Sequence, residues 1–410
     1  MKYCNPICKM KNIIRKFLNI FGIRITKKLK IYSQYQFNVF KSSYKDKVLL
    51  SYIVEPFVNG LNYSHTNYLE CYTVAEIFHN LGFSIDVVDF ALNKRIDYNK
   101  YKVIFGMGSV LEKSFYYSEV GKPIKIFYST GCNLIYSNVN TILRVRDFYN
   151  KHKRLLISSS RFISQSQYLQ SLLSDGVIVL GNQFVLNTFT DYDPNGKDRY
   201  YRLNPFFYDV YDIDLDKKDF SKAKKNFLWF GSGGLIHKGL DILLDIFCQL
   251  SDINLHICGN LQKERGFFDY YRLFLTKYTN IIYHGFIKID SDDFKELMNT
   301  CGYVVYPSVS EGGSPSVLNT MANGGLVPII TKASGLNMDS FGWVIERPDV
   351  DLFKDIINKA VLLSDKELKE KSIKVKSHVR NTYNYEVYKQ NLTFIIQEIL
   401  KNNLDFNNYK

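Results

Sequence analysis

The segment YPSVSEGGSPSVLNTMANGG, residues 306–325, decides the fold of the carboxy-terminal half of the chain. It continues a short apolar run at 303–307, which reads as a buried strand. Ser314 suits the N-cap of a helix and Pro315 suits its first position. The apolar residues that follow recur at helical spacing: Val317, Leu318, Met321 and Ala322. The segment therefore predicts a strand, a glycine loop and a helix.

The glycine loop of this segment predicts an anion site. Gly312 and Gly313 allow the backbone to approach a ligand, and the amino terminus of a helix offers unpaired N–H groups and positive potential. Such a place suits a diphosphate. Glu311 would lie at the far end of that diphosphate, where its carboxylate can accept hydrogen bonds from a sugar. Asn319, more than one turn inside the helix, would face the nucleoside side.

Another glycine loop, the first loop in chain order, occurs in FGSGGLIHKGLDILLDIF, residues 230–247, and the loop at Gly312 and Gly313 is the second loop. Lys238 lies beside Gly233 and Gly234 at the start of an amphipathic helix. A cation at this end opposes the helix dipole by up to about 1 kcal/mol, so a bound anion would relieve the conflict. The alternative is a solvated lysine beside glycines that serve only the turn.

Together the two loops resemble those of glycosyltransferase family four, the glycosyl transferases group 1, which are retaining enzymes with two facing Rossmann-like domains (the GT-B fold). The matching residues are Gly231, Lys238, Gly239, Glu311, Gly312, Met321, Ala322 and Gly324. The resemblance implies that Lys238 neutralises the leaving diphosphate and that Glu311 holds hydroxyls of the transferred sugar, as the two catalytic residues. The donor-binding residues that it implies are Gly231, Ser232, Gly233, Gly312, Gly313, Ser314, Pro315, Ser316, Val317 and Asn319.

Two positions depart from the family pattern. The usual arginine of the first loop is Ser232, and the usual second glutamate of the other loop is Asn319. The loss of the arginine removes one cation from the diphosphate site. Asn319 can still hydrogen-bond a ribose hydroxyl, but a neutral amide does so more weakly than a carboxylate.

The rest of the chain alternates short apolar runs with helical segments. Runs at 49–54, 85–88 and 124–129 begin a first series, and a second series starts at 227–230. Because these runs are apolar on both faces, they predict parallel sheets covered by helices on both sides. The predicted fold class is α/β, with two Rossmann-like domains facing across a cleft (GT-B) and an amino-terminal amphipathic basic helix.

The 410 residues divide into five predicted parts. These are a basic arm (1–45), a Rossmann-like acceptor domain (46–205), a linker (206–225), a Rossmann-like nucleotide-sugar domain (226–385) and a carboxy-terminal helix (386–410) that can pack back on the first domain.

The acceptor is expected in the first domain. The loop at 56–67 follows the first strand, where open α/β sheets bind ligands, and it contains Gly60, His65 and Asn67. A second loop, after the strand at 124–129, contains Thr130. The alternatives are a structural or solvated histidine and an ordinary turn.

The net charge of +13 is concentrated in the arm. Residues 1–45 contain eleven Lys or Arg and no Asp or Glu, which leaves +2 for the remaining chain. A nearly neutral body does not favour nucleic acid as a partner. Apolar residues from Met10 to Ile25 recur at helical spacing, so residues 9–30 predict a basic amphipathic helix that lies on an anionic membrane surface. A helix that packs on the protein itself is the alternative. The arm is too interrupted by polar residues to span a bilayer.

The seven cysteines are scattered and read as reduced thiols, and no ligand pattern predicts a metal. The expected localisation is cytoplasmic, at the inner face of the cell membrane. The expected activity is metal-independent transfer of a sugar, with retention, from a nucleoside diphosphate sugar to a membrane-linked or polysaccharide acceptor in cell-surface glycan synthesis, with no other cofactor. The alternatives are a GT-B epimerase or hydrolase and a non-catalytic sugar-nucleotide-binding protein. Substitution of Glu311 or Lys238 by alanine is expected to abolish turnover with little change in melting temperature.

Overall fold

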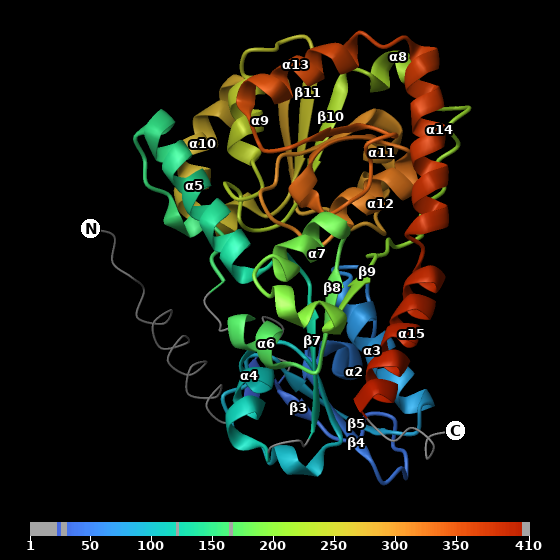
Figure 1. The fold of residues 1–410 in the computed structure, drawn as a ribbon. Coiled ribbons are helices and arrows are strands. Elements are labelled where there is room, and N and C mark those ends of the chain that lie inside the picture. Colours follow the sequence, from blue (N-terminus) through green and yellow to red (C-terminus); the bar gives the residue numbers. More distant parts are fainter. Residues whose placement is uncertain (1–22, 26–30, 120–122, 164–166, 404–410) are drawn as a thin grey trace.

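The computed structural model describes residues 23–25, 31–119, 123–163 and 167–403. Figure 1 shows two α/β domains, one above the other, joined along one side. Each domain is built on a sheet of buried strands with helices on both faces, so the predicted α/β class with two Rossmann-like domains is confirmed.

The first domain contains a seven-stranded sheet in the order β3-β5-β4-β6-β7-β8-β9, parallel except for the edge strand β3. Its strands are β3 (Tyr35–Gln36), β4 (Lys47–Tyr52), β5 (Ser84–Asp89), β6 (Val103–Gly106), β7 (Ile124–Ser129), β8 (Gly176–Leu180) and β9 (Tyr200–Leu203). Its helices are α2 (Glu55–Asn59), α3 (Asn67–Asn80), α4 (Gly108–Tyr117), α5 (Leu134–His152), α6 (Gln167–Leu173) and α7 (Gln183–Thr190). Buried apolar side chains on both faces of the strands explain why helices cover both sides.

The second domain contains a six-stranded parallel sheet in the order β12-β11-β10-β13-β14-β15. Its strands are β10 (Asn226–Phe230), β11 (Asn254–Cys258), β12 (Ile281–Gly285), β13 (Tyr303–Tyr306), β14 (Val327–Thr331) and β15 (Trp343–Ile345). Its helices are α8 (Phe220–Ala223), α9 (Leu240–Phe247), α10 (Arg265–Lys277), α11 (Asp292–Thr300), α12 (Pro315–Gly324), α13 (Val350–Val361) and α14 (Asp365–Thr382). In both sheets the strand order reverses beside the first long strand, which places ligand sites at the carboxyl ends of β4, β10 and β13.

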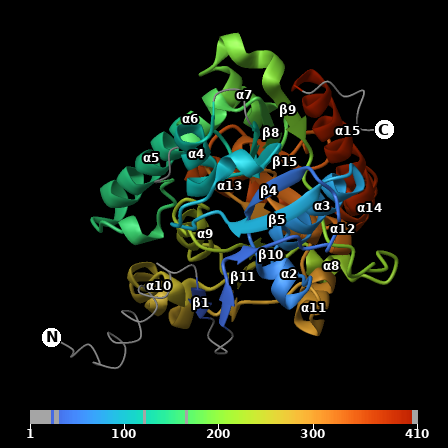
Figure 2. The ribbon, with the colours of Figure 1, turned by 90° about the horizontal axis from the view of Figure 1, so that it is seen from below.

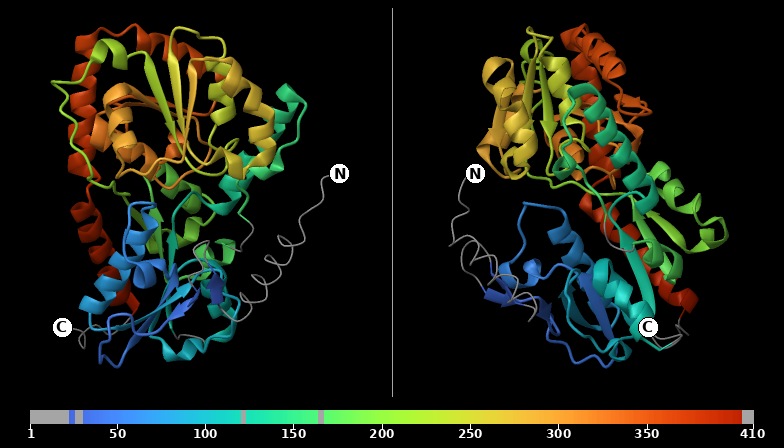
Figure 3. Two further views of the ribbon diagram at one scale, coloured as in Figure 1. Left: turned by 180° about the vertical axis from the view of Figure 1, so that it is seen from behind. Right: turned by 90° about the vertical axis from the view of Figure 1, so that its left-hand side faces the viewer.

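The last helix, α15 (Tyr385–Asn403), returns to the first domain. It packs against α3 and β9, and Figure 2 shows α3 and α15 side by side. The two views of Figure 3 show α14 along the second domain and α15 along the first. The described part of the chain therefore crosses between the domains twice, once before α8 and once between α14 and α15. A hydrogen bond from the Phe207 N–H to the Tyr383 carbonyl, 3.2 Å, joins the two crossings.

The amino-terminal arm differs from its prediction in two respects. Ile23–Ile25 form a short strand, β1, which pairs antiparallel with β2 (Ile31–Ser33), so a helix does not extend to Ile25. β3 belongs to the sheet of the first domain, and Phe40 packs against its core, so this domain begins before residue 46. Residues 1–22 and 26–30, which carry most of the predicted amphipathic helix, lie outside the described residues.

The predicted linker is also shorter than expected. Ile213, Leu215 and Phe220 are buried, and Lys218 donates hydrogen bonds to the carbonyls at the ends of α11 and α12. From about residue 213 the segment is thus part of the second domain. None of the helices in the described part of the chain is both long and apolar enough to cross a membrane.

Candidate active site

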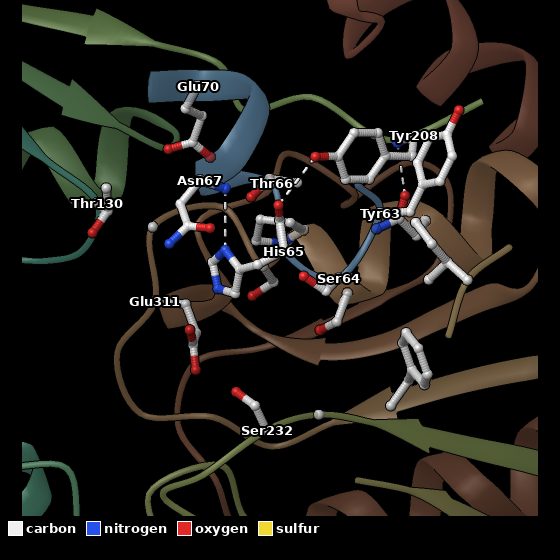
Figure 4. A pocket seen from close by; sticks show the side chains of 18 of the residues that line it. Tyr63, Ser64, His65, Thr66, Asn67, Glu70, Thr130, Tyr208, Ser232 and Glu311 are labelled. Atoms are coloured by element: carbon white, nitrogen blue, oxygen red, sulfur yellow. Dashed lines mark hydrogen bonds between the residues drawn. The ribbon is translucent and has the colours of Figure 1, made fainter. Parts of the chain in front are cut away.

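A cavity of about 300 Å³ lies between the carboxyl ends of the two sheets. The loop after β4 and the loop after β7 line it from the first domain, and the loops after β10, β12 and β13 line it from the second. Figure 4 shows His65, Asn67 and Thr130 on one side of this pocket and Ser232 and Glu311 on the other. The pocket is therefore bounded by both domains.

Glu311 is bound by side chains of both domains. Its Oε1 accepts hydrogen bonds from Lys238 Nζ at 2.7 Å, Ser308 Oγ at 2.9 Å and the Tyr306 hydroxyl at 3.3 Å. Arg161 Nη1 lies 3.3 Å from Oε2. Burial alone would raise the pKa of this carboxyl, but Lys238 and Arg161 outweigh burial and hold the pKa at about 2. Glu311 is therefore an anion at any physiological pH.

Lys238 is buried rather than solvated, with 6% of its side chain exposed. Besides Glu311, its Nζ donates to the Tyr306 hydroxyl at 2.6 Å. Burial lowers the pKa of Lys238, and the charge of Glu311 opposes that effect. The predicted conflict between this cation and the start of α9 is thus relieved by an internal carboxylate. An ammonium has three donors, so one remains for a ligand.

The two catalytic candidates form a buried ion pair, which changes one expectation. Removal of one partner from a buried pair leaves an uncompensated charge and costs about 3–5 kcal/mol. We therefore now expect alanine at Glu311 or Lys238 to lower the melting temperature, in place of the little change expected from the sequence.

The glycines of the second loop serve close packing between the domains. A Cβ on Gly312 would collide with the carbonyl of Thr130, and a Cβ on Gly313, whose φ is +82°, would collide with Pro205. Gly312 lines the pocket, whereas Gly313 lies behind it. Contacts with the first domain therefore require glycine at both positions.

Helix α12 starts where the sequence predicts it, but its cap differs. Ser314 holds the N-cap position with φ +39°, makes no side-chain cap bond and donates instead to the Ser334 carbonyl at 2.9 Å. Pro315 and Ser316 line the pocket, so the amino terminus of α12 points into it. Val317 is fully buried in the core and does not reach the cavity.

Asn319 has a structural partner that the sequence did not indicate. Its Oδ1 accepts a hydrogen bond from the Tyr208 N–H at 2.8 Å, and Asn323, one turn later, binds the backbone of Val210 and Tyr211. Asn319 lines the pocket, but this oxygen holds the crossing between the domains. A ribose hydroxyl would have to use the remaining hydrogen-bonding capacity of the amide.

In the first loop, Gly231 and Ser232 line the pocket, and Gly233 does not. A Cβ on Gly231 would lie 2.7 Å from the Trp229 ring, so the glycine is required by the core. Gly233 faces Glu264, whose carboxylate accepts from the Gly234 and Leu235 N–H groups.

Three of the four acceptor-side candidates lie in the pocket: His65, Asn67 and Thr130. Gly60 does not; it is exposed at the end of α2, with φ +78°. His65 Nδ1 accepts the Asn67 N–H at 3.1 Å, so the neutral ring carries its proton on Nε2. His65 is exposed to the solvent that fills the pocket. The walls of the pocket nevertheless enclose its ring. This enclosure, with Arg161 and Lys238, lowers the pKa of His65 to about 4.

The structure adds pocket residues that the sequence did not single out, including Arg161, Glu70 and Tyr208. Glu70 lies on α3, where it accepts a hydrogen bond from the Tyr52 hydroxyl at 2.7 Å, and burial raises its pKa. Arg161 lies in SSSRF, a segment with no periodicity or motif, and it reaches Glu311 across the cleft. Within the described parts of the chain, no group of three or more His, Cys, Asp or Glu side chains could hold a metal ion.

The two facing Rossmann-like sheets, with a pocket at their carboxyl ends, define the GT-B fold. Residues 212–378 match the model of the family glycosyl transferases group 1, so the predicted resemblance is confirmed over this region. A comparison of the sequence with curated proteins gave no match.

Solved structures with the same fold are distant in sequence. Anabaena HepE, solved with UDP and glucose, is 14% identical with a TM-score of 0.55, over 86% of this chain and 99% of HepE. S. aureus TarM, solved with UDP, fondaparinux and α-GlcNAc-glycerol, is 13% identical with a TM-score of 0.50, over 73% of this chain. This chain spans 56% of the length of TarM. These likenesses establish the fold.

Proposed function

We propose that the protein transfers a sugar from a nucleoside diphosphate sugar to an acceptor hydroxyl. The observation that carries this proposal is the Glu311–Lys238 pair, 2.7 Å apart, beside the amino terminus of α12 and facing the first domain. The carboxylate can accept hydrogen bonds from sugar hydroxyls. The free donor of Lys238 and the end of α12 can stabilise the charge that develops on a departing diphosphate.

The nature of the donor is supported by the fold. HepE was solved with UDP-glucose, and this chain shares its fold over nearly the whole of HepE. In the second domain, Phe286 and Ile287 follow β12 and line the pocket beside Gly231, which gives an apolar surface for a base. We therefore place the nucleoside between the loops after β10 and β12, and the sugar against Glu311.

Retention at the anomeric carbon is part of the proposal because the resemblance to glycosyl transferases group 1, matched over residues 212–378, implies it. His65 presents Nε2–H to the pocket, because its Nδ1 already accepts the Asn67 N–H. It can thus donate a hydrogen bond to a substrate oxygen but is not poised to take a proton at Nε2. The configuration of the product, read by NMR from the anomeric coupling constant, tests retention.

Metal independence is part of the proposal because two cationic side chains, Lys238 and Arg161, already contact the centre of the pocket. Turnover should persist in excess EDTA after the chelator has been shown to strip added Mg²⁺. Loss of turnover in EDTA, with recovery on addition of Mg²⁺, would contradict it.

The main experiment incubates the purified protein with a panel of nucleotide sugars, with and without lipid-linked and polysaccharide acceptors, and follows the free nucleoside diphosphate. Acceptor-dependent release is the expected result. Release of the nucleoside diphosphate at the same rate with and without acceptor would instead identify a hydrolase. Conversion of the nucleotide sugar to an epimer without release of the nucleoside diphosphate would identify an epimerase. Binding without any turnover would identify a non-catalytic protein.

We further propose a membrane-linked or polysaccharide acceptor used in cell-surface glycan synthesis at the cytoplasmic face of the membrane. The support is the charge of the arm, where the predicted membrane-binding segment is residues 9–30. Deletion of residues 1–22 should lower co-sedimentation with anionic vesicles and leave binding to neutral vesicles unchanged. Equal sedimentation of both forms would reject the membrane part without affecting the proposed transfer.

A further inference from the structure

Arg161 of the first domain lies over the glycine loop of the second. It follows α5, and its Cβ would lie 3.3 Å from a Cβ placed on Gly234. Its Nη1 is 3.3 Å from Glu311 Oε2, and the side chain lines the same cavity as Ser232 and Lys238. The guanidinium therefore stands directly across the cleft from the loop that precedes α9.

The second domain supplies little positive charge of its own to this point. Ser232, exposed in the loop after β10, is neutral, and the charge of Lys238 is paired with that of Glu311. Lys288 also lines the pocket, but it follows β12 with the apolar residues of the nucleoside side. The two cations that contact Glu311 are Arg161 and Lys238, one from each domain.

We propose that Arg161 binds the diphosphate of the donor together with Lys238, and so provides from the first domain the cation that Ser232 does not provide in the second. This inference rests on the proposed function. A guanidinium presents a planar fork of donors that matches two phosphate oxygens, which a lysine cannot do.

The contact between Arg161 and Glu311 is weak enough for the guanidinium to leave Glu311 and bind a phosphate instead. Its side chain is 49% exposed, and its 3.3 Å contact is longer than the 2.7 Å contact of Lys238. Charge-assisted N–H···O bonds are usually 2.7–2.9 Å, so Arg161 is held loosely. When sugar hydroxyls occupy Glu311, the guanidinium can turn to the diphosphate. The donor would then join residues of both domains, and its diphosphate would draw the cleft together.

Calorimetric titration with UDP, GDP, inorganic pyrophosphate and uridine tests the inference without depending on turnover. Arg161→Ala should weaken binding of pyrophosphate and of the preferred nucleoside diphosphate by at least about tenfold, the range expected for a charged hydrogen bond. Uridine, which lacks phosphate, should bind equally to both forms. Arg146→Ala, at an exposed arginine of α5, is the control and should bind like the wild type.

A second variant separates charge from structure. In Arg161→Ala/Ser232→Arg the cation returns from the second domain, and we expect diphosphate affinity to recover to within about threefold of the wild type. Failure of this rescue, with uridine binding weakened as much as diphosphate binding, would show a structural role and overturn the inference. Unchanged diphosphate binding in Arg161→Ala would overturn the role of Arg161 and leave the proposed function standing. Absence of nucleotide binding by the wild type would overturn both.

Discussion

At the residue scale, the pocket is organised around one carboxylate. Glu311 is held by Lys238, Ser308 and Tyr306 from its own domain and by Arg161 from the other. These contacts keep it ionised and aim it into the cavity before any ligand arrives. Preorganised charge of this kind is what electrostatic catalysis requires, because it needs no rearrangement when the leaving group departs.

Glu311→Gln should abolish turnover and also destabilise the protein. The folded pKa of about 2 lies below the usual value of 4.5, so the stability contributed by Glu311 is fully present above pH 4.5 and is lost as pH falls toward 2. The variant should be less stable than the wild type by about 3 kcal/mol at pH 7. Urea unfolding at pH 7 and pH 3 should show the difference shrinking at the lower pH; a difference independent of pH would contradict the ion pair.

At the element scale, α5 joins the first domain to α9 of the second. Arg144 Nη2 lies 2.6 Å from Asp241 Oδ2, with both side chains buried, and Lys151 and His152 lie 2.8 and 3.0 Å from Asp245. Thr141 shares a 2.8 Å hydrogen bond with His237 Nδ1, whose Nε2 is bound to the Ser310 carbonyl. Helix α5 thus connects with the glycine loop and the Glu311 loop at once.

The buried pair on this helix should dominate its contribution to stability. Arg144→Met leaves Asp241 buried without its partner and should cost about 3–5 kcal/mol, whereas Arg144→Met/Asp241→Leu should recover most of that loss. Arg146→Met, on the same helix but in an exposed pair with Asp147, should change stability by less than about 1 kcal/mol. Urea unfolding of the four proteins measures this, and equal losses in the two single variants would contradict it.

The burial of His237 predicts a second response to pH. Burial lowers its pKa to about 4, although Glu311 opposes that effect. Its stabilising contribution is therefore fully present above pH 6.5, the usual value, and is lost as pH falls toward 4. His237→Gln should flatten the fall in unfolding free energy over this window, which lies above that of Glu311. An unchanged slope between pH 6.5 and 4 would argue against a buried neutral imidazole.

At the scale of the whole molecule, α15 fastens the end of the described chain to the first domain. Tyr388 shares a 3.1 Å hydrogen bond with Tyr128, and Ile399 packs on Gly176 at the start of β8. Gly176 is needed here because a Cβ would lie 2.6 Å from Ile399 Cδ1.

Gly176→Ala should therefore lower the melting temperature, since overpacking costs about 1–3 kcal/mol, and Ile399→Val in the same protein should restore part of the loss. Gly131→Ala, where a Cβ would meet no atom within 4 Å, is the matched control. Differential scanning calorimetry measures the melting temperatures of these variants. If Gly131→Ala lowers the melting temperature as much as Gly176→Ala does, the clash with α15 is not the cause.

The sequence predicts the strands and helices of the two Rossmann-like domains better than it predicts the contacts of the pocket residues. Apolar runs such as those of β4 and β10 are continuous, so their burial on both faces follows from composition alone. β3 is only two residues long and β9 is YYRL, and neither carries such a run. The roles of Arg161 and Asn319 depend on contacts with Glu311, 150 residues away, and with Tyr208, 111 residues away, which no local pattern encodes.

The two chain crossings determine how the molecule can move. They lie on one side, tied by the bond between Phe207 and Tyr383, while α5 and α9 meet on the other side (Figure 1). The crossings make this edge a natural hinge, and any opening about it would have to break the contacts of α5 with α9 and α10. A pair of fluorophores, one on α5 and one on α10, would report the loss of these contacts, and its rate could be compared with product release.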